Sequence, residues 1–226
     1  MAIDAKTYWD KHYTAKPFGA GKGPSDFLHQ MLPRLESGKV LDIGMGEGQN
    51  AVYLAQKGFQ VKGFDISKVA VEHAKQLAKD SSVSIEAQST DLDLYLFGIM
   101  EYDSIIMTKF RPTNTRYYPS IISALKQGGI LLIESYGVPE MNEAIGKDEE
   151  YRNFFFHSNE ILKNIQGLRI LFYQEGLVND RHVVQCLAQK PIDKDAAKLK
   201  LFDMSTKKND VESSKHLELA ERLFKK

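Results

Sequence analysis

The chain has 226 residues, and its 30 Lys and Arg residues balance its 30 Asp and Glu residues. This length allows one large domain with a full hydrophobic core, and the balanced charge gives no overall field that would attract nucleic acid or an anionic membrane. No stretch approaches the roughly 20 apolar residues of a membrane span, and the polar N-terminus lacks the apolar core of a secretion signal. The single cysteine, Cys186, excludes an internal disulfide and is expected to be a buried core residue. We expect a cytoplasmic protein without a nucleic-acid or membrane partner.

Two helical patterns open the chain. Residues 4–14 are rich in aromatic side chains, and Ser25 is placed as the N-cap of a second helix that runs to Leu35. The turn-rich loop 17–24 separates them. We assign residues 1–38 to a helical lid segment.

From Lys39 onward, apolar strands alternate with helices. The strands are predicted at 40–43, 60–64, 83–87, 102–107 and 129–135. The intervening helices are predicted at 50–57, 68–78 (with Ser67 as its N-cap) and 115–126. Nearly continuous apolar strands in such an alternation are typical of a doubly wound parallel sheet with helices on both faces.

The alternation breaks after Tyr136. Residues 137–166 form an aromatic-rich insertion with a short helix predicted at 158–165, and two further strands follow at 168–174 and 182–188. The seven residues between these strands are too few for a right-handed crossover helix, so the final pair must be antiparallel. We therefore predict an α/β fold with a mostly parallel, seven-stranded sheet and an antiparallel final strand pair. The main domain would cover 39–190, and 191–226 would form a lysine-rich linker and one amphipathic helix.

A glycine-rich loop follows the first strand. Gly44, Gly46 and Gly48 stand at alternate positions between a strand and a helix, where glycine allows a sharp turn and close approach of a ligand. Asp65 ends the second strand, 19 residues after Gly46, where an acid can accept hydrogen bonds from both ribose hydroxyls. Strand, loop, helix and acid together predict a nucleotide-type ligand.

The carboxylates around this loop favour one kind of nucleotide. Asp42 precedes the loop and Glu47 lies within it, and two carboxylates would repel a pyrophosphate but suit a ligand with an ammonium and a sulfonium group. The antiparallel final strands also do not belong to the dinucleotide-binding fold. We therefore predict S-adenosylmethionine as the cofactor, and a nicotinamide oxidoreductase, which would bind NAD, is the less favoured alternative.

The sequence resembles a known family. The stretch Val40-Leu41-Asp42-Ile43-Gly44-Met45-Gly46-Glu47-Gly48 looks like the first motif of class I methyltransferases, and Gly63-Phe64-Asp65-Ile66-Ser67 resembles their second. The resemblance extends from Tyr8 to about Lys190. The opening 8–13 and the ending 175–185 are similar to a bacterial subgroup of small-molecule type that is called tellurite-resistance-like.

The resemblance implies which residues hold the methionine part of the cofactor. The three loop glycines would wrap it, Asp42 would organise the loop and the ammonium, and the carbonyls of Met107 and Thr108 would lie near the ammonium. Met45 stands where the subgroup has a small residue, and we expect it to tighten the pocket floor.

The resemblance also implies the adenosine contacts. Asp65 would hold the ribose, Ile66 would pack on the adenine face, and Asp91, with the Leu92 backbone beside it, would accept from the adenine amino group. Asp93 is only two residues away, and either acid is a possible helix cap. We favour Asp91.

Acceptor contacts are expected beyond the carboxyl ends of the strands. Methyl transfer is a single in-line displacement, so the protein contributes mainly alignment, which is worth up to ~7–11 kcal/mol, and exclusion of water. The N-terminal segment and the loop after the fourth strand can reach this place, although their aromatics also fit core packing and their cations also fit a solvated surface. These candidate substrate contacts are Tyr8, Trp9, Phe18, Lys109 and Arg111. Two inward cations would favour an anionic acceptor.

No catalytic residue is fixed by the pattern. His182 begins the last strand and is a candidate base, although a lone histidine at a strand edge is also often structural. The histidines and the cysteine show no metal-ligand spacing. No Asn-Pro-Pro-Tyr or Asp-Pro-Pro-Tyr follows the fourth strand, which disfavours methylation of a base amino group. The leading hypothesis is a methyltransferase with a small-molecule acceptor, and the alternative is a non-catalytic module that binds S-adenosylmethionine or S-adenosylhomocysteine.

Overall fold

The computed structural model describes residues 4–19, 21–112, 114–137 and 155–192. One compact unit spans Met1–Pro191. The linker and helix expected over 191–226 lie, apart from the first two residues, outside the described residues, as does most of the insertion expected over 137–166. Within the described ranges, no helix is long and apolar enough to cross a membrane.

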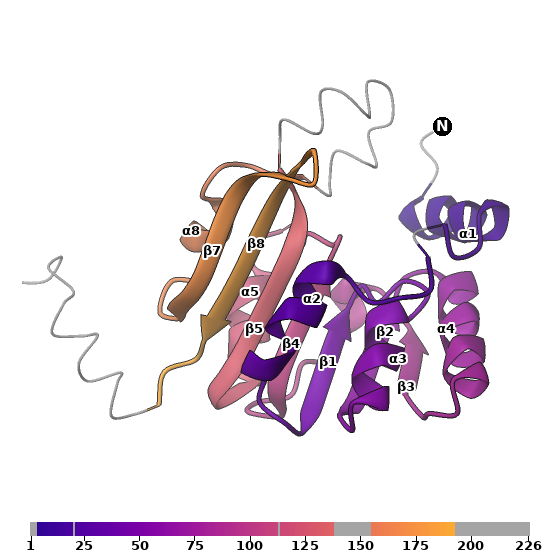
Figure 1. Cartoon of the computed structure of the whole chain (residues 1–226), viewed down its shortest axis with the longest axis horizontal. Helices are drawn as coiled ribbons and strands as arrows, with labels where there is room; N and C mark the ends of the chain where they lie inside the picture. Colours follow the sequence, from indigo (N-terminus) through magenta and orange to yellow (C-terminus); the bar gives the residue numbers. More distant parts are fainter. Residues whose placement is uncertain (1–3, 20, 113, 138–154, 193–226) are drawn as a thin grey trace, which may run out of the picture. The chain divides into compact units, whose positions relative to one another are not determined.

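A single mixed sheet organises the unit, with the strand order β3-β2-β1-β4-β5-β8-β7 (Figure 1). The first five strands in this order are mutually parallel. They are β1 Lys39–Ile43, β2 Gln60–Asp65, β3 Glu86–Ser89, β4 Tyr102–Thr108 and β5 Leu125–Gly137. Because the chain passes from β1 to one side of the sheet and later returns to β4 on the other side, a switch point lies between β1 and β4, where ligands of doubly wound sheets bind.

The last strands close the sheet in the opposite direction. β8 (Arg181–Gln189) pairs antiparallel with both β5 and β7 (Arg169–Val178), which confirms the expected antiparallel pair. The connection is shorter than expected, because both strands extend until only Asn179 and Asp180 remain between them, each with a positive φ (50° and 61°). Two such residues form the tight turn that suits the twist of a hairpin.

An eighth strand was not anticipated from the sequence. β6 (Phe155–Phe156) pairs in parallel with Tyr136–Gly137 at the end of β5, so the sheet has eight strands rather than seven. Two residues are too short a run to show a period of two. The position of the third parallel strand also differs, because β3 begins at Glu86 rather than Val83, whose side chain instead packs near α4.

Helices cover both faces of the sheet. Alternation along β1 sends Val40 into a core with α2 (Asp26–Met31) and α3 (Gln49–Gln56), and Leu41 into a core with α5 (Tyr117–Ala124) and α8 (Glu160–Asn164). Figure 1 shows α2 and α3 in front of the strands and α5 behind them. Cys186 lies fully buried in the second core, as expected.

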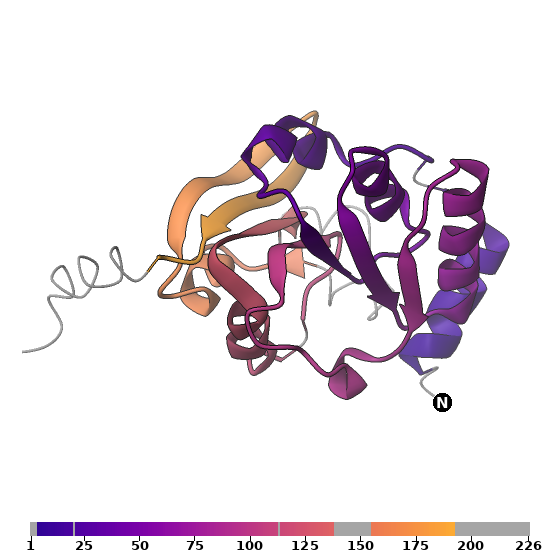
Figure 2. The ribbon, with the colours of Figure 1, turned by 90° about the horizontal axis from the view of Figure 1, so that it is seen from below.

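The remaining helices surround the strand ends. α4 (Lys68–Asp80) follows β2, and the 3-10 helices η1 (Leu32–Arg34) and η2 (Leu92–Leu94) follow α2 and β3. α1 (Ala5–Ala15) lies beside α4 in both ribbon views and buries none of its side chains completely (Figures 1 and 2). The expected N-caps Ser25 and Ser67 are confirmed, since each accepts from a backbone N–H three residues ahead.

Candidate cofactor and acceptor site

The expected cofactor residues meet at one edge of the sheet. β1, β2, β3 and β4 are parallel neighbours, so their carboxyl ends lie together. This arrangement places the glycine loop after β1, Asp65 at the end of β2, Asp91 just beyond β3, and Thr108 at the end of β4. These residues are far apart in the sequence, and the parallel pairing of the four strands brings them together.

The three loop glycines all have positive φ angles, of 66° for Gly44, 54° for Gly46 and 79° for Gly48. This left-handed region strains any residue with a Cβ. Gly48 is also packed tightly, because a Cβ there would lie 2.6 Å from the Cβ of Ala74 on α4. The glycines are therefore required both by the backbone turn and by the contact between the loop and α4.

A glycine on the neighbouring strand, Gly63, makes room for the bulky side chain of Met45. Its side chain is buried against Val71 and Ala74 of α4, and its sulfur lies 2.5 Å from where a Cβ of Gly63 on β2 would be. Met45 thus fills the space that Gly63 leaves on the neighbouring strand. Sequence spacing alone did not reveal this compensation.

Asp65 holds the loop in place. Its Oδ2 accepts from the backbone N–H of Gly46 at 2.9 Å, and its Oδ1 accepts from that of Ser67 at 2.8 Å. Burial raises the pKa of Asp65 to about 6, the two backbone donors oppose this rise, and the nearby charge of Asp10 adds to it. Asp65, the acid expected to bind a ribose, thus already links the glycine loop to the N-terminus of α4 through two hydrogen bonds.

Asp42 is the least satisfied polar group of the site. It is fully buried, and neither carboxylate oxygen has a hydrogen-bond partner among the described residues. Alternation along β1 puts it on the same face as Val40, beneath α3. Burial, followed by the charge of Asp65, raises the pKa of Asp42 to about 8. A buried carboxylate without partners is costly unless a cationic ligand satisfies it.

Glu47 does not play the part expected of it. Both of its carboxylate oxygens accept from the backbone N–H of Phe18 at 2.8 Å, and Oε1 lies 2.8 Å from Nδ1 of His73 on α4. The side chain is 3% exposed. Glu47 therefore anchors the N-terminal segment instead of contributing a free negative charge to the loop, and the cofactor preference rests on Asp42 and Asp65.

Two further contacts fasten the same segment to the start of α3. The Gln49 side chain donates to the carbonyl of Gly21 at 3.0 Å, and Oδ1 of Asn50 accepts from the N–H of Ser25 at 2.9 Å. Asn50 also donates to the hydroxyl of Thr108, at 2.6 Å, and so links the segment to the end of β4. We call residues 17–19 and 21–25 the strap.

α1 reaches the site through Asp10 and Tyr13. Asp10 accepts from the hydroxyl of Ser67 at 2.6 Å and from the N–H of Val69 at 3.3 Å, at the N-terminus of α4. The hydroxyl oxygen of Tyr13 would lie 3.0 Å from a Cβ on Gly46. Neither Asp10 nor Asn50 belongs to a motif that could be recognised in the sequence, since both roles depend on contacts between distant segments.

The adenosine candidates lie where β2 and β3 end. Asp91 is the N-cap of η2 and accepts from the N–H of Asp93, while Asp93 is exposed and forms an ion pair with Arg116. Ile66 and Leu92 are half-buried. Asp91 therefore caps a helix, and a role for it in adenine binding stays a prediction.

The aromatic candidates of the acceptor side are half-buried. Trp9 lies edge-on to Tyr8, with ring centroids 5.1 Å apart, and both belong to α1. Phe18, in the strap, stacks on His73 at 5.6 Å, and the ammonium of Lys22 lies 5.0 Å from the Phe18 ring. Of these rings, Phe18 is the one that the described contacts link to the glycine loop, because its backbone N–H donates to Glu47.

The two expected cations differ from one another. Lys109 is exposed, with a φ of 51°. Arg111 donates through Nε to Glu160 of α8 at 2.8 Å, with side-chain exposures of 18% and 15%, and its guanidinium lies 5.7 Å from the Phe156 ring centroid. The ring of Phe110, between them, would lie 2.5 Å from a Cβ on Gly44 and so covers the first loop glycine.

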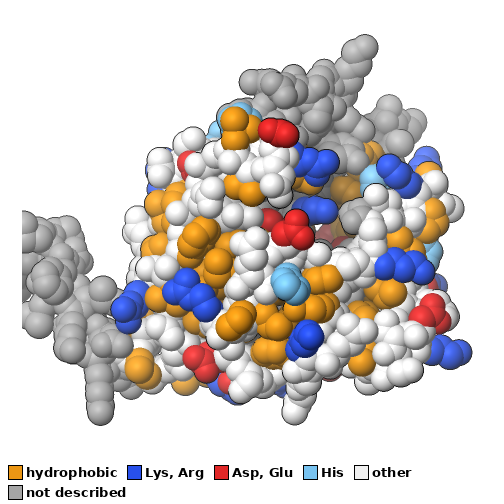
Figure 3. All heavy atoms as spheres, in the orientation of Figure 1, with side chains coloured by type: hydrophobic (Ala, Val, Ile, Leu, Met, Phe, Trp, Pro, Cys, Tyr) orange, Lys and Arg blue, Asp and Glu red, His pale blue; other side chains and the backbone are white. Residues whose placement is uncertain are grey.

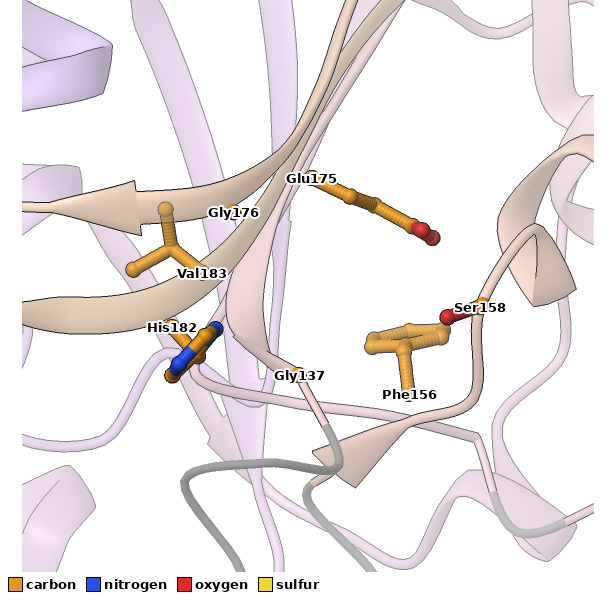
Figure 4. Close-up of a pocket in the computed structure, with 7 residues that line it drawn as sticks. All are labelled: Gly137, Phe156, Ser158, Glu175, Gly176, His182 and Val183. Atoms are coloured by element: carbon orange, nitrogen blue, oxygen red, sulfur yellow. The ribbon is translucent and has the colours of Figure 1, made fainter.

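A cavity of about 230 Å³ opens at the same edge of the sheet, between the end of β5 and the β7–β8 hairpin (Figure 4). His182 and Val183 lie on one side of it, and Phe156 and Ser158 lie on the other, with the Glu175 side chain extending towards Ser158. The expected candidate base His182 is thus a cavity wall residue. Across the residues that the structure describes, no cluster of three His, Cys, Asp or Glu side chains could hold a metal ion.

Comparisons with known proteins agree with this geometry. A family described as a methyltransferase domain matches residues 40–129, from β1 into β5. A protein of Geobacillus sp. (strain WCH70) that is named as a methyltransferase is 26% identical over 172 residues, which cover 71% of this chain and 65% of that protein. TehB of Haemophilus influenzae, named as an S-adenosyl-L-methionine-dependent methyltransferase, is 28% identical over 145 residues, which cover 62% of this chain and 49% of TehB.

The fold is shared as well. The crystal structure of TehB from Haemophilus influenzae is similar with a TM-score of 0.63 at 18% identity, over 80% of this chain and 67% of that one. The chain spans less than two thirds of the length of either curated relative. Further relatives are named for methylation of ribosomal protein L11 and of a tRNA uracil, so the names differ in the acceptor.

Proposed function

The chain carries a class I S-adenosylmethionine-dependent methyltransferase domain, and from this premise we propose that it transfers the methyl group to a small-molecule acceptor. The observation that carries the cofactor assignment is Asp42, a fully buried carboxylate without a hydrogen-bond partner among the described residues, beside the glycine loop. An ammonium or sulfonium cation satisfies such a group, and a pyrophosphate does not.

The residues at the strand ends fit the parts of this cofactor. Asp42 and the loop glycines would hold the methionine part, and Asp65 would take the ribose hydroxyls in addition to its backbone donors. Ile66, Asp91 and the Leu92 backbone, at the ends of β2 and β3, would hold the adenine. Met107 and Thr108 end β4, beside the loop.

Two features support a small acceptor. The strap is hydrogen-bonded to Glu47 of the glycine loop and to Gln49 and Asn50 just after it, and we infer that it covers the site from the side of α1. On the face shown in Figure 3, basic and acidic side chains are scattered among one another, without the basic surface that a nucleic acid would need. A covered site of this kind suits a small molecule better than a folded macromolecule.

The bound cofactor supplies a methyl group on a good leaving group, so little proton chemistry is required of the protein. The chain contributes alignment of the two reactants, which is worth up to ~7–11 kcal/mol, and exclusion of water. The glycine loop and Asp65 fix the donor, while the strap and Phe110 close the space above the loop.

Cofactor binding is tested first. Asp65→Ala should weaken S-adenosylhomocysteine binding by roughly 1–3 kcal/mol, because the ribose hydroxyls lose a buried acceptor. Isothermal titration calorimetry measures this, with Asp93→Ala as the matched control that should leave the affinity unchanged. Equal affinity in both variants would mean that another acid binds the ribose, and preferential binding of NAD by the wild type would overturn the assignment.

Transfer is tested with radiolabelled S-adenosylmethionine. The full chain is incubated with a bacterial extract divided into a filtrate below about 3 kDa, a protein fraction and an RNA fraction. The proposal predicts label in the filtrate, and much less with Asp65→Ala. Label in the protein or RNA fraction contradicts the small acceptor, and binding without transfer to any fraction favours the non-catalytic module.

A further inference from the structure

The cavity at the β7–β8 hairpin lies at the same edge of the sheet as the cofactor residues, on the side of β5 and β8. Gly137 at the end of β5 and Val183 near the start of β8 form part of its wall, and both lie at the carboxyl edge of the parallel strands. Strands are spaced by about 4.8 Å, so β5 lies roughly 10 Å and β8 roughly 14 Å from β1 along this edge. A donor held at β1 and an acceptor held at β5 and β8 would therefore meet over β4.

The shape of the cavity suits a single ring. Its volume is about 230 Å³, below the range of drug-sized pockets. Phe156 forms one wall and is itself 1% exposed, and the Arg111 guanidinium lies over its ring. At Gly176 a Cβ would meet nothing within 4 Å, so the hairpin leaves open space there. The ring of Phe156 is thus part of the packed wall, and the open space beside Gly176, in a cavity of this volume, has room for a guest of about one ring.

The charge of the described lining disfavours the anionic acceptor that two inward cations would have favoured. Glu175 supplies a carboxylate, and no Lys or Arg belongs to the described lining. Three cations lie in neighbouring segments, and none belongs to the described lining: Arg111 is paired with Glu160, Arg181 donates to the Tyr136 hydroxyl at 3.5 Å, and Lys109 is exposed. An acceptor with a carboxylate would face Glu175 without a cation to balance it.

Glu175 keeps hydrogen-bonding capacity for a guest. Among the described residues, it accepts from the backbone N–H of Asn159 at 2.7 Å and from the hydroxyl of Tyr173, and both bonds end on Oε1. A carboxylate can accept about four hydrogen bonds, so Oε2 can still accept from a ligand. These bonds also fix the side chain, which reduces the entropy lost when a ligand binds.

We infer that this cavity receives the methyl acceptor, and that the acceptor is a small ring compound with an amine or hydroxyl group rather than a carboxylate. The inference rests on the proposed function. The methyl–sulfur bond breaks as the bond from methyl to the acceptor nitrogen or oxygen forms, and sulfur keeps the electron pair. The proton of the acceptor passes to the imidazole of His182, and from there to solvent.

The test uses saturation-transfer NMR on the full chain loaded with S-adenosylhomocysteine, with phenol, benzylamine and benzoate as probes. Phenol and benzylamine should bind the wild type, and benzoate should not. Val183→Phe fills the cavity and should lower the phenol and benzylamine signals at least tenfold. Glu175→Gln keeps an acceptor for Asn159 and Tyr173 but removes the charge, and should weaken benzylamine more than phenol.

Val83→Phe is the matched control, because Val83 lines a second hollow of about 310 Å³ beside α4. It introduces the same side chain and should leave all three probe signals unchanged, and thermal unfolding checks that both variants are folded. Preferential binding of benzoate, or unchanged signals in Val183→Phe, overturns the inference. The proposed function then still stands if S-adenosylhomocysteine binds by calorimetry, and fails if it does not.

Discussion

The two halves of the sheet satisfy their polar groups in different ways. In the half formed by β1, β2 and β3, Asp42 is buried without a partner among the described residues. On the side of β5, β8 and β7, Arg111 of the loop after β4 is paired with Glu160 of α8. The first half buries a carboxyl group with no partner on either oxygen, whereas in the second half the partly buried Glu134 of β5 is half satisfied, because Gln185 donates to its Oε1 at 2.9 Å and only Oε2 lacks a partner among the described residues.

This difference explains why the cofactor is easier to assign than the acceptor. A buried charged group without a partner indicates the charge of its ligand. Leaving the group unsatisfied costs free energy, which a ligand of opposite charge recovers. The acceptor cavity has no such unpartnered buried group in its described lining, so its walls constrain mainly the size and shape of the acceptor. Three experiments test this difference between the halves, and they follow in order of decreasing expected effect.

Gly48→Ala should show how strictly the cofactor half is built. A Cβ at this φ of 79° adds strain and would collide with Ala74 on α4, so the free energy of unfolding should fall by about 2–5 kcal/mol. Urea denaturation measures it. Gly58→Ala is the control, since its φ is also positive, at 90°, but nothing lies within 4 Å of the added Cβ. Equal losses in the two variants would refute the packing argument.

Asp42→Asn should change the pH dependence of stability. The pKa of Asp42 is about 8 in the folded chain against an ordinary 3.8, so the folded chain holds an extra proton between these values. Its free energy of unfolding should therefore fall as pH rises through this window, by about 2 kcal/mol between pH 6 and pH 8, and the variant should lose this slope.

The measurement is urea unfolding of the ligand-free chain at each pH. Asp103→Asn provides a control of opposite sign, because hydrogen bonds from Lys126 and the Lys39 backbone outweigh burial and lower the pKa of Asp103. The stability that Asp103 contributes is present above its ordinary pKa and is lost only as pH falls below it. An unchanged slope in Asp42→Asn would show that this carboxylate is already paired in solution.

A double-mutant cycle on Arg111 and Glu160 tests the other half. Because both side chains are largely buried, Arg111→Met and Glu160→Gln should show a coupling of about 1 kcal/mol in thermal unfolding, above a typical surface pair. The exposed pair Lys75 and Glu72 on α4 should give only about 0.2–0.5 kcal/mol. Coupling near zero would leave Arg111 free for an anionic acceptor.

Much of the cofactor half followed from short stretches of sequence. The glycine loop, the acid at the end of β2 and the cap Ser67 depend on residues within a few positions of each other. The antiparallel closure also followed, because a short connection permits only one strand direction. Helix caps and hydrophobic periodicity depend on residues that are close in the sequence, so they can be recognised before the tertiary structure is known.

The acceptor half could not be predicted in the same way. β6 is two residues long, and its partners lie at the end of β5. Arg111 is paired with Glu160, which lies 49 residues later in the sequence. An anionic acceptor was tied to two inward cations, and the sequence could not show that Arg111 already has a carboxylate partner. Pairings of this kind depend on which segments the sheet brings together.

The sequence alone determined that a loop with three glycines and two nearby acids would sit at the end of the first strand, and it identified the ligand class from them. Only the tertiary structure decided what each acid does. Glu47 is bonded to Phe18, 29 residues earlier in the chain, whereas Asp42 has no partner among the described residues. The physical reason is that charge and spacing are properties of the chain, while the burial and pairing of a charge arise only when distant segments come together.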